Sequence, residues 1–320
     1  MPKLPHMDFL TPSIPFIQKI QTVSWLLAPM KAVTLLGNEE FFLLLLPLVY
    51  WLINRRLGAQ LGVLLLVSVC LNDIVKLLFQ LPRPYWTGAV TAYATEKSFG
   101  FPSGHAQNAS LLWPFVALQT KNEKLWFFLS LALLALISFS RLYLGVHYPL
   151  DIVGGWLLGG LLLLLTLRFQ TPVIARWKRF SLTERLSFIF VMVGCIALAF
   201  ALVGLGKPYE ADGSPQALAQ WNAGESMIAR IAALTGLLVG LAIVPQFETE
   251  GSAVTKGLRL LVGMIGLAFF YVGLKKILPD ENVFRFFRYF LTTFWVIFGA
   301  PTLFLKLGLA QREKINRPVD

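Results

Sequence analysis

About nine stretches of roughly 20 mostly apolar residues, separated by short polar or charged connectors, constrain this chain more than any other feature of its sequence. A helix needs about 20 such residues to cross a bilayer, so each stretch predicts a membrane-spanning helix. The sequence therefore predicts an all-α fold, a polytopic transmembrane helical bundle of about nine spans. The predicted spans begin near Leu36, Leu57, Ala106, Leu125, Ile152, Leu186, Ile228, Leu258 and Phe286.

The third predicted span differs from the others because polar side chains interrupt its start. Gln107, Asn108 and Ser110 lie in its first turns. Polar groups are costly in hydrocarbon, so we expect this segment to be partly buried in protein rather than fully exposed to lipid.

Composition agrees with a membrane protein. The chain is 56% hydrophobic and 14% charged, with a mean hydropathy of +0.67, whereas charged residues make up roughly a quarter of soluble domains. The net charge of +11 would suggest nucleic-acid binding in a soluble chain. In a polytopic membrane protein, Lys and Arg are retained on cytoplasmic loops during insertion. We therefore expect no nucleic-acid partner.

Cysteine and histidine usage argues against a metal centre or a disulfide. Cys70 and Cys195 both lie in apolar stretches, where cysteine usually acts as a small hydrophobic residue. The 3 histidines are too few for a typical His-rich zinc site, and the sequence has no HExxH or CxxC pattern. We predict no metal and no other cofactor.

The predicted spans divide the chain into three regions. Residues 1–35 form an N-terminal interfacial segment, 36–170 a core of spans one to five that we predict to be catalytic, and 171–320 the spans six to nine. In the first region apolar side chains recur at helical spacing, which predicts a helix along the membrane surface, kinked at Pro29. These side chains are Phe16, Ile20, Val23, Leu27 and Met30.

Two pairs of glycines have the small-xxx-small spacing that permits close helix contact. They are Gly155 with Gly159 and Gly236 with Gly240. Ordinary glycines of a membrane helix explain the same pattern equally well.

Basic residues orient the predicted spans. The connectors after spans one, three and five carry Arg55, Lys121 and Arg168 with further basic neighbours, so they should be cytoplasmic. This places the N-terminus outside and, with an odd number of spans, the C-terminus inside. We expect an integral membrane protein, and favour a bacterial inner membrane.

Three blocks of residues that can carry chemistry fall at the ends of predicted spans two to five. Span parity places all of these ends at the outer, periplasmic face. The blocks are Lys76 with Arg83-Pro84, then Pro102-Ser103-Gly104-His105, then Ser140-Arg141 with His147 and Asp151.

Several of these residues are suited to holding a phosphate group. Arg83 and Arg141 offer planar guanidinium groups, and Lys76 adds a compact positive charge. Ser103 and Gly104 directly precede a predicted helix, where a hydroxyl and free backbone N–H groups meet the positive end of the helix dipole. We therefore predict that these five residues bind phosphate.

The histidines supply the chemistry. His147 and Asp151 are four residues apart, so the carboxylate can accept from one ring nitrogen and leave the other free to attack. Pro149 qualifies this, since it would start the helix and leave His147 just before it. His105 is the predicted general acid and base. The predicted catalytic residues are therefore His147, His105 and Asp151.

These blocks resemble the three-part signature of the type 2 phosphatidic acid phosphatase (PAP2) superfamily, which shares its site with vanadium haloperoxidases. The resemblance implies a phosphatase that forms a phosphohistidine at His147 and needs no metal. A layout of nine spans with an outside N-terminus is similar to the glucose-6-phosphatase family, as is the RPYW string of Arg83–Trp86. The matching positions are Lys76, Arg83, Pro84, Pro102, Ser103, Gly104, His105, Ser140, Arg141, His147 and Asp151.

The leading functional hypothesis is hydrolysis of a lipid phosphate or diphosphate, because a site at the membrane surface can admit a head group while the tails stay in the bilayer. The expected partners are this substrate, or a small phosphate ester, and membrane lipids. A sugar phosphatase is the first alternative, favoured by the predicted nine spans. A vanadium-dependent peroxidase and a lipid or anion transporter or scramblase are the others.

Overall fold

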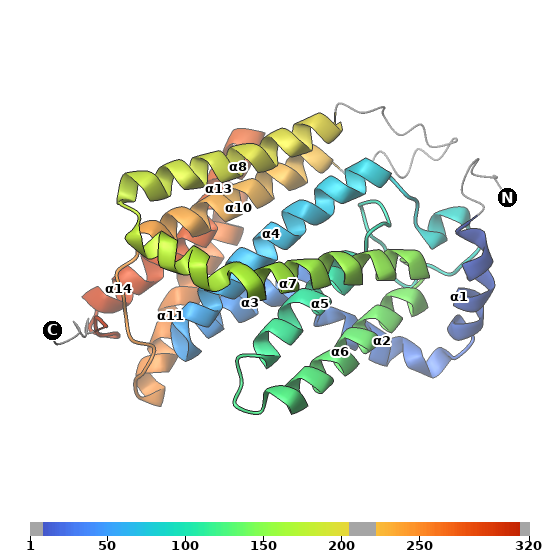
Figure 1. Ribbon diagram of the computed structural model, residues 1–320, viewed down its shortest axis with the longest axis horizontal. Helices are drawn as coiled ribbons and strands as arrows, with labels where there is room; N and C mark the ends of the chain where they lie inside the picture. Colours follow the sequence, from blue (N-terminus) through green and yellow to red (C-terminus); the bar gives the residue numbers. More distant parts are fainter. Residues whose placement is uncertain (1–8, 205–221, 314–320) are drawn as a thin grey trace. The chain divides into compact units, whose positions relative to one another are not determined.

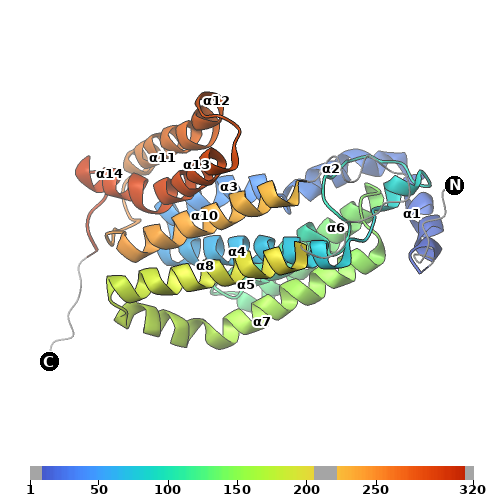
Figure 2. The same cartoon turned by 90° about the horizontal axis from the view of Figure 1, so that it is seen from above.

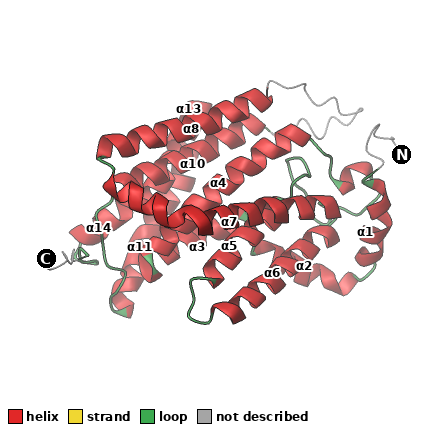
Figure 3. Cartoon of the chain, in the orientation of Figure 1, coloured by secondary structure: helices red, strands yellow, loops and turns green. Residues whose placement is uncertain are grey.

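The computed structural model describes residues 9–204 and 222–313; residues 1–8, 205–221 and 314–320 lie outside the described part. Across the described residues the chain is helical, and the one pairing of β type is an isolated antiparallel bridge between Phe247 and Arg312 (Figure 3). The predicted all-α fold is confirmed.

Seven helices of the described chain are long and apolar enough to cross a membrane, or eight if a bent helix pair counts as one span. The prediction of about nine spans is therefore not confirmed. The bent pair joins Ser24–Leu35 to Glu39–Ile53 at 48°. The seven are Arg55–Thr87, Glu123–Tyr143, Pro149–Arg179, Leu182–Gly204, Ala223–Ile243, Ala253–Ile277 and Asn282–Lys306.

The predicted third span is the short helix α5 (Gly104–Ala117). Its 14 residues rise about 21 Å at 1.5 Å each, whereas the hydrocarbon core of a bilayer is about 30 Å thick. After its end, the Thr120 hydroxyl donates to the Ala117 carbonyl, and Lys121 follows. Most of its side chains are buried, including the three polar ones near its start, so the predicted partial burial is confirmed.

The predicted first span is broken by the structure. It begins at the end of α2 (Leu27–Leu35), and the chain turns at Gly37 and Asn38 before α3 (Glu39–Leu48). A π-helical turn, η3 (Val49–Ile53), then leads into α4 (Arg55–Phe79). Hydropathy counts apolar residues and does not detect such breaks, so a predicted span can correspond to two shorter helices.

The structure divides into two compact units. The first comprises Met1–Phe42, Val67–Arg176 and Ala197–Met227; the second comprises Leu43–Leu66, Trp177–Ile196 and Ile228–Asp320. Within the first unit, α6 (Glu123–Tyr143) packs along α5 and also contacts α2 (Figures 1 and 2). Helices α1 (Ile14–Gln21) and α7 (Pro149–Arg179) also belong to this unit, except for the last residues of α7.

The N-terminal segment forms two helices rather than one kinked helix. The break is at Thr22 and Val23, where the Val23 backbone leaves the helical region, and not at Pro29. Pro29 lies in the first turn of α2, where a missing N–H costs no hydrogen bond. The short helices η1 (Thr11–Ser13) and η2 (Ser24–Leu26) precede α1 and α2. The position of this segment at a membrane surface stays a prediction.

A buried polar network joins α4 to α5. The Gln107 amide donates to the carbonyl and hydroxyl oxygens of Ser68, both at 2.8 Å, and accepts from Asn72 at 2.7 Å. Ser68 also donates to Asn108 at 2.9 Å. Because each polar group meets another, this network lets polar side chains lie inside an apolar bundle and fixes the register of the two helices.

Glycines of α7 permit close contact with α5. A Cβ on Gly155 would lie 2.6 Å from the Ser103 carbonyl oxygen, and one on Gly159 would lie 2.3 Å from the Gln107 carbonyl oxygen. Gly160, on another face, has no atom within 4 Å of such a Cβ. Gly155 and Gly159 are therefore packing residues, which settles the two interpretations of this pair.

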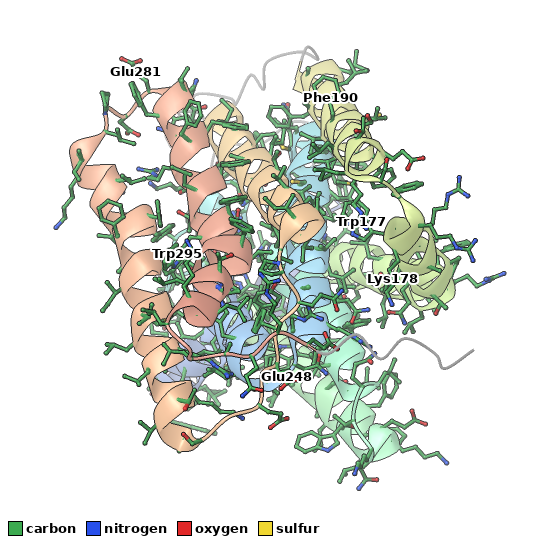
Figure 4. The ribbon with its side chains drawn as sticks, turned by 90° about the vertical axis from the view of Figure 1, so that its left-hand side faces the viewer. Trp177, Lys178, Phe190, Glu248, Glu281 and Trp295 are labelled. Atoms are coloured by element: carbon green, nitrogen blue, oxygen red, sulfur yellow. The ribbon has the colours of Figure 1, made fainter. Side chains whose placement is uncertain are left out.

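The second unit is held together by tryptophans that donate to backbone carbonyls. Trp295 lies between α11 and α13 and donates to Gly263 at 3.0 Å (Figure 4). Trp51 donates to Val296 at 2.8 Å. The remaining elements of the second unit are α8 (Leu182–Gly204), α10 (Ala223–Ile243), α11 (Ala253–Ala268), η5 (Phe269–Gly273), α12 (Leu274–Ile277), α13 (Asn282–Phe294), η6 (Trp295–Gly299) and α14 (Ala300–Lys306). Helices α8 and α10 extend into both units.

Candidate active site

The first unit brings together all of the predicted site residues, at the ends of four helices. Lys76 lies in the last turn of α4 and Arg141 in the last turn of α6. Ser103 is the N-cap of α5, and Asp151 lies in the first turn of α7. Two C-terminal helix ends and two N-terminal ends thus surround one set of buried side chains.

His147 lies in the tight turn that connects α6 to α7. Its Nδ1 atom is 3.1 Å from Oδ2 of Asp151, which also accepts from the backbone N–H of Tyr148 at 2.9 Å. The other oxygen of Asp151, Oδ1, is buried and has no partner among the described residues. The helix begins at Pro149, so His147 stands just before it, as the sequence indicated.

Arg83 determines which nitrogen of His147 carries the hydrogen. Its Nη1 atom lies 3.1 Å from Nε2 of His147. A guanidinium group only donates, so Nε2 must offer its lone pair, and the hydrogen is therefore on Nδ1, where it is donated to Asp151. The pair of contacts holds His147 in the tautomer whose Nε2 is able to attack an electrophile.

The remaining donors of Arg83 are bound to backbone and hydroxyl oxygens. Nε donates to the Ser98 carbonyl at 2.6 Å, Nη1 to the Val146 carbonyl at 2.9 Å, and Nη2 to the Phe99 carbonyl at 3.0 Å. Nη2 also reaches the Ser98 hydroxyl at 3.2 Å. Arg83 therefore connects the loop before α5 to the turn that carries His147. Among all of its contacts, only the one from Nη1 to Nε2 of His147 involves an atom that takes part in the proposed chemistry.

Arg141 is buried and retains one donor without a partner. Its Nη1 atom donates to the Thr34 hydroxyl at 2.7 Å, and its Nη2 atom forms an ion pair with Glu96. Nε is buried and makes no hydrogen bond within the described part of the chain. An unsatisfied donor of a buried cation costs free energy, and a bound anion would satisfy it.

Lys76 is also buried, and its ammonium group donates to the Phe99 carbonyl. The short segment Glu96–Phe99 thus accepts hydrogen bonds from the three buried cations of the site, Lys76, Arg83 and Arg141. This segment belongs to the loop between η4 (Pro84–Thr87) and α5.

The start of α5 offers backbone donors. The Ser103 hydroxyl accepts from the Ala106 N–H, and the Ser103 N–H is bound by the Asp151 carbonyl at 2.9 Å. Within the described residues, no acceptor is bonded to the backbone N–H groups of Gly104 and His105. A Cβ on Gly104 would lie 3.3 Å from Oδ1 of Asn72, so a larger residue would crowd this approach.

His105 faces the turn between α2 and α3. Its Nε2 atom lies 2.6 Å from Oδ1 of Asn38, an acceptor, so Nε2 carries a hydrogen and Nδ1 remains for proton exchange. Gly37 allows this packing, since a Cβ there would be 3.0 Å from the imidazole ring.

Two groups of the site that lie in loops have shifted pKa values. Burial, and then the nearby Arg83, lower the pKa of His147 well below its usual value of 6.5. Burial would raise the pKa of Glu96, but Arg141, followed by Arg83, His105 and Lys76, outweighs it and lowers that pKa to about 2. His147 is therefore neutral and Glu96 ionised at neutral pH.

Three partners of the site were missed by the sequence reasoning. Glu96 and Thr34 contact Arg141 directly, and Asn38 contacts His105. Glu96 had a usable signal, because it is the one acidic residue between Asp73 and Glu123 in the sequence. Thr34 and Asn38 had none, since no motif surrounds Thr34 near the end of α2 or Asn38 in the turn that follows.

No group of three or more His, Cys, Asp or Glu side chains in the described chain is arranged to hold a metal ion. The cations Arg83, Arg141 and Lys76 lie close enough to His147 to influence its ring, and they suit an anionic ligand.

Comparison with known proteins extends over both halves of the chain. Residues 57–175 match the model of the PAP2 superfamily, and residues 228–312 match that of the PAP2 superfamily phosphatase, transmembrane extension. With the seven apolar helices, these matches indicate an integral membrane protein.

Among curated proteins, the chain is 33% identical over 156 residues to one named "Probable sphingosine-1-phosphate phosphatase" from Dictyostelium discoideum, covering 44% of this chain and 38% of that protein. It is 32% identical over 168 residues to phosphatidylglycerophosphatase B of Bacillus subtilis, covering 49% of this chain and 79% of that one. An undecaprenyl-diphosphatase of Sulfolobus acidocaldarius is 30% identical over 120 residues, with 37% and 57% covered.

A solved structure is also similar, the crystal structure of the first transmembrane PAP2 type phosphatidylglycerolphosphate phosphatase from Bacillus subtilis. The identity is 27%, the TM-score is 0.46, and the match covers 55% of this chain and 91% of that one. The match to the amoebal and archaeal relatives spans less than two thirds of their lengths.

Proposed function

Because this chain belongs to the PAP2 superfamily, we propose that it is a membrane phosphatase that hydrolyses a lipid phosphate or diphosphate through a phosphohistidine at His147. The observation that carries the proposal is the paired contact of His147, with Asp151 on Nδ1 and Arg83 on Nε2. A ring held from both sides in this tautomer, among buried cations, is arranged for attack on an anionic phosphoryl group.

In the first step, Nε2 of His147 attacks phosphorus, and the bond from phosphorus to the leaving oxygen breaks. Arg83 Nη1, which now contacts Nε2, transfers its hydrogen bond to a phosphoryl oxygen. His105, protonated on Nδ1 when the step begins, donates that proton to the leaving oxygen and keeps the hydrogen on Nε2. The lipid therefore departs as a neutral alcohol, or as a monophosphate from a diphosphate. Asp151 stabilises the positive charge that develops on the imidazole.

In the second step, His105 accepts a proton from water, the oxygen of which attacks phosphorus. The bond from nitrogen to phosphorus breaks, inorganic phosphate is released, and His147 regains its lone pair. The phosphoryl oxygens are held in both steps by Lys76, by the Nε donor of Arg141 and by the N–H groups at the start of α5.

These donors neutralise the phosphoryl charge without a metal ion, which supports a metal-independent reaction. Ser103 contributes by capping α5 and Gly104 by leaving room for the phosphate near the backbone. The substrate class is proposed from the relatives, which are named for sphingosine-1-phosphate, phosphatidylglycerophosphate and undecaprenyl diphosphate. We propose that the site opens at the non-cytoplasmic face, as the basic connectors indicate, and keep a bacterial inner membrane as the expected location.

The test is a panel of these three lipid phosphates and a hexose phosphate, offered to the purified protein in detergent with detection of inorganic phosphate. We expect release from at least one lipid, inhibition by vanadate, no effect of EDTA, and no release by His147→Ala. Release from the hexose phosphate alone would favour a sugar phosphatase. Full release by His147→Ala would contradict the phosphohistidine mechanism, and no release by the wild type from any phosphate ester would favour a transporter.

A further inference from the structure

The proposed mechanism leaves one charged group at the site without a role. Glu96 pairs with Nη2 of Arg141, and its carboxylate is influenced by the four cationic or titratable groups that would surround the phosphate. These groups are Arg141, Arg83, His105 and Lys76. A carboxylate at this position is a negative charge placed among the donors that a substrate needs.

Glu96 is held in place by its backbone. The Tyr85 hydroxyl donates to the Glu96 carbonyl at 2.9 Å and accepts from the Glu96 N–H at 3.1 Å. Its side chain is 31% exposed, whereas that of Arg141 is 2% exposed. The carboxylate can therefore turn toward solvent while its backbone and the buried guanidinium stay where they are.

We propose that Glu96 is a specificity-determining residue that makes the site selective for terminal phosphates over phosphodiesters, by competing with the ligand for Arg141. The inference rests on the proposed function, and it concerns which anions are admitted rather than how the phosphate is cleaved.

Charge supplies the selectivity. A terminal phosphate carries about −1.5 to −2 at pH 7, so it gains more from the buried cations than the single charge of Glu96 does. A phosphodiester carries one negative charge, no more than the carboxylate that it must displace, and it cannot recover the cost of displacement. A membrane presents phosphodiester lipids in large excess, so an enzyme without this competitor would be occupied by lipids that it does not hydrolyse.

The test compares Glu96→Gln with wild type and with Glu40→Gln, a control that removes the same charge from an exposed position on α3. Phosphatidic acid is hydrolysed in neutral detergent micelles while phosphatidylglycerol, a phosphodiester, is added at increasing mole fraction. We expect Glu96→Gln to lower the inhibition constant of phosphatidylglycerol about tenfold, the effect of about 1.4 kcal/mol, with the Glu40→Gln value within twofold of wild type.

A second variant separates competition from simple positioning of Arg141. Thr34→Val removes the other hydrogen bond to that guanidinium without removing a negative charge. Binding of inorganic phosphate, measured by calorimetry, should tighten in Glu96→Gln and should not tighten in Thr34→Val. Weaker phosphate binding in both variants, or unchanged inhibition by phosphatidylglycerol in Glu96→Gln, would overturn the inference. Failure of the proposed function would differ, since wild type would then release no phosphate from phosphatidic acid or the other lipids.

Discussion

Replacing Asp151 by Asn tests the charge of this carboxylate with the smallest change in shape. Oδ2 of Asp151 accepts from both Nδ1 of His147 and the Tyr148 N–H. An amide oxygen in the same place can accept from both, and the NH₂ group then takes the position of Oδ1, which has no partner within the described residues. The tautomer of His147 is kept. What is lost is the negative charge that stabilises the imidazole when it becomes positive.

The expected loss is in turnover. Removing one group that stabilises developing charge in a transition state typically lowers kcat about 10²- to 10³-fold, and we expect a fall of this size here. This corresponds to about 2.7 to 4 kcal/mol in the activation free energy.

The assay is steady-state hydrolysis of the best lipid substrate, with binding of inorganic phosphate followed by calorimetry. Phosphate should bind Asp151→Asn within about threefold of wild type, since Lys76 and Arg141 are unchanged. Thermal unfolding in detergent verifies that the variant is folded. A large rise in KM with unchanged kcat, or a loss of kcat below tenfold, would refute the reasoning.

Three further predictions follow from the site and its supports. Gly159→Ala should lower stability by about 1–3 kcal/mol, because its Cβ would overlap the backbone of α5, while Gly160→Ala should stay within about 0.5 kcal/mol; thermal unfolding of both variants checks this. Burial lowers the pKa of His147 in the folded protein below 6.5. The contribution of the neutral ring to the free energy of unfolding is therefore complete above pH 6.5, and it is lost as the pH falls from 6.5 through the folded pKa. Nitrogen NMR of the 3 histidines should therefore show no midpoint for His147 at or above 6.5. Arg83→Lys should lower kcat/KM at least about 100-fold, because an ammonium group is unable to bridge two backbone segments and the imidazole at once; activity within tenfold of wild type would contradict this role.

The sequence was sufficient for the fold class and for the position of the site. Lys76, Arg141 and Asp151 each lie in the terminal turn of an apolar helix, so counting spans placed them on one side before any contact was known. The spacing of His147 and Asp151 likewise predicted their contact. These features depend on local pattern, which hydropathy and helical geometry describe well.

The contacts of the loop before α5 were beyond this reasoning. Glu96 and Phe99 lie in a segment with no helical or strand periodicity, so nothing in their order predicts that they accept from Arg141 and Lys76. The same holds for Asn38 and His105, which are 67 residues apart. The short length of α5, 14 residues, was likewise not predicted, because hydropathy does not detect where such a helix ends.

The amide of Gln21 has a consequence for how this protein is handled in the laboratory. It donates to the carbonyls of Thr91 and Tyr143, at 2.8 and 2.9 Å, and accepts from the Thr91 N–H at 3.1 Å. One side chain of the N-terminal helix thus joins the loop that carries Glu96 to the end of the helix that carries Arg141. A shortened form that lacks α1 would insert its apolar helices as before, yet turn over slowly, so the N-terminal helix should be kept in any expression design.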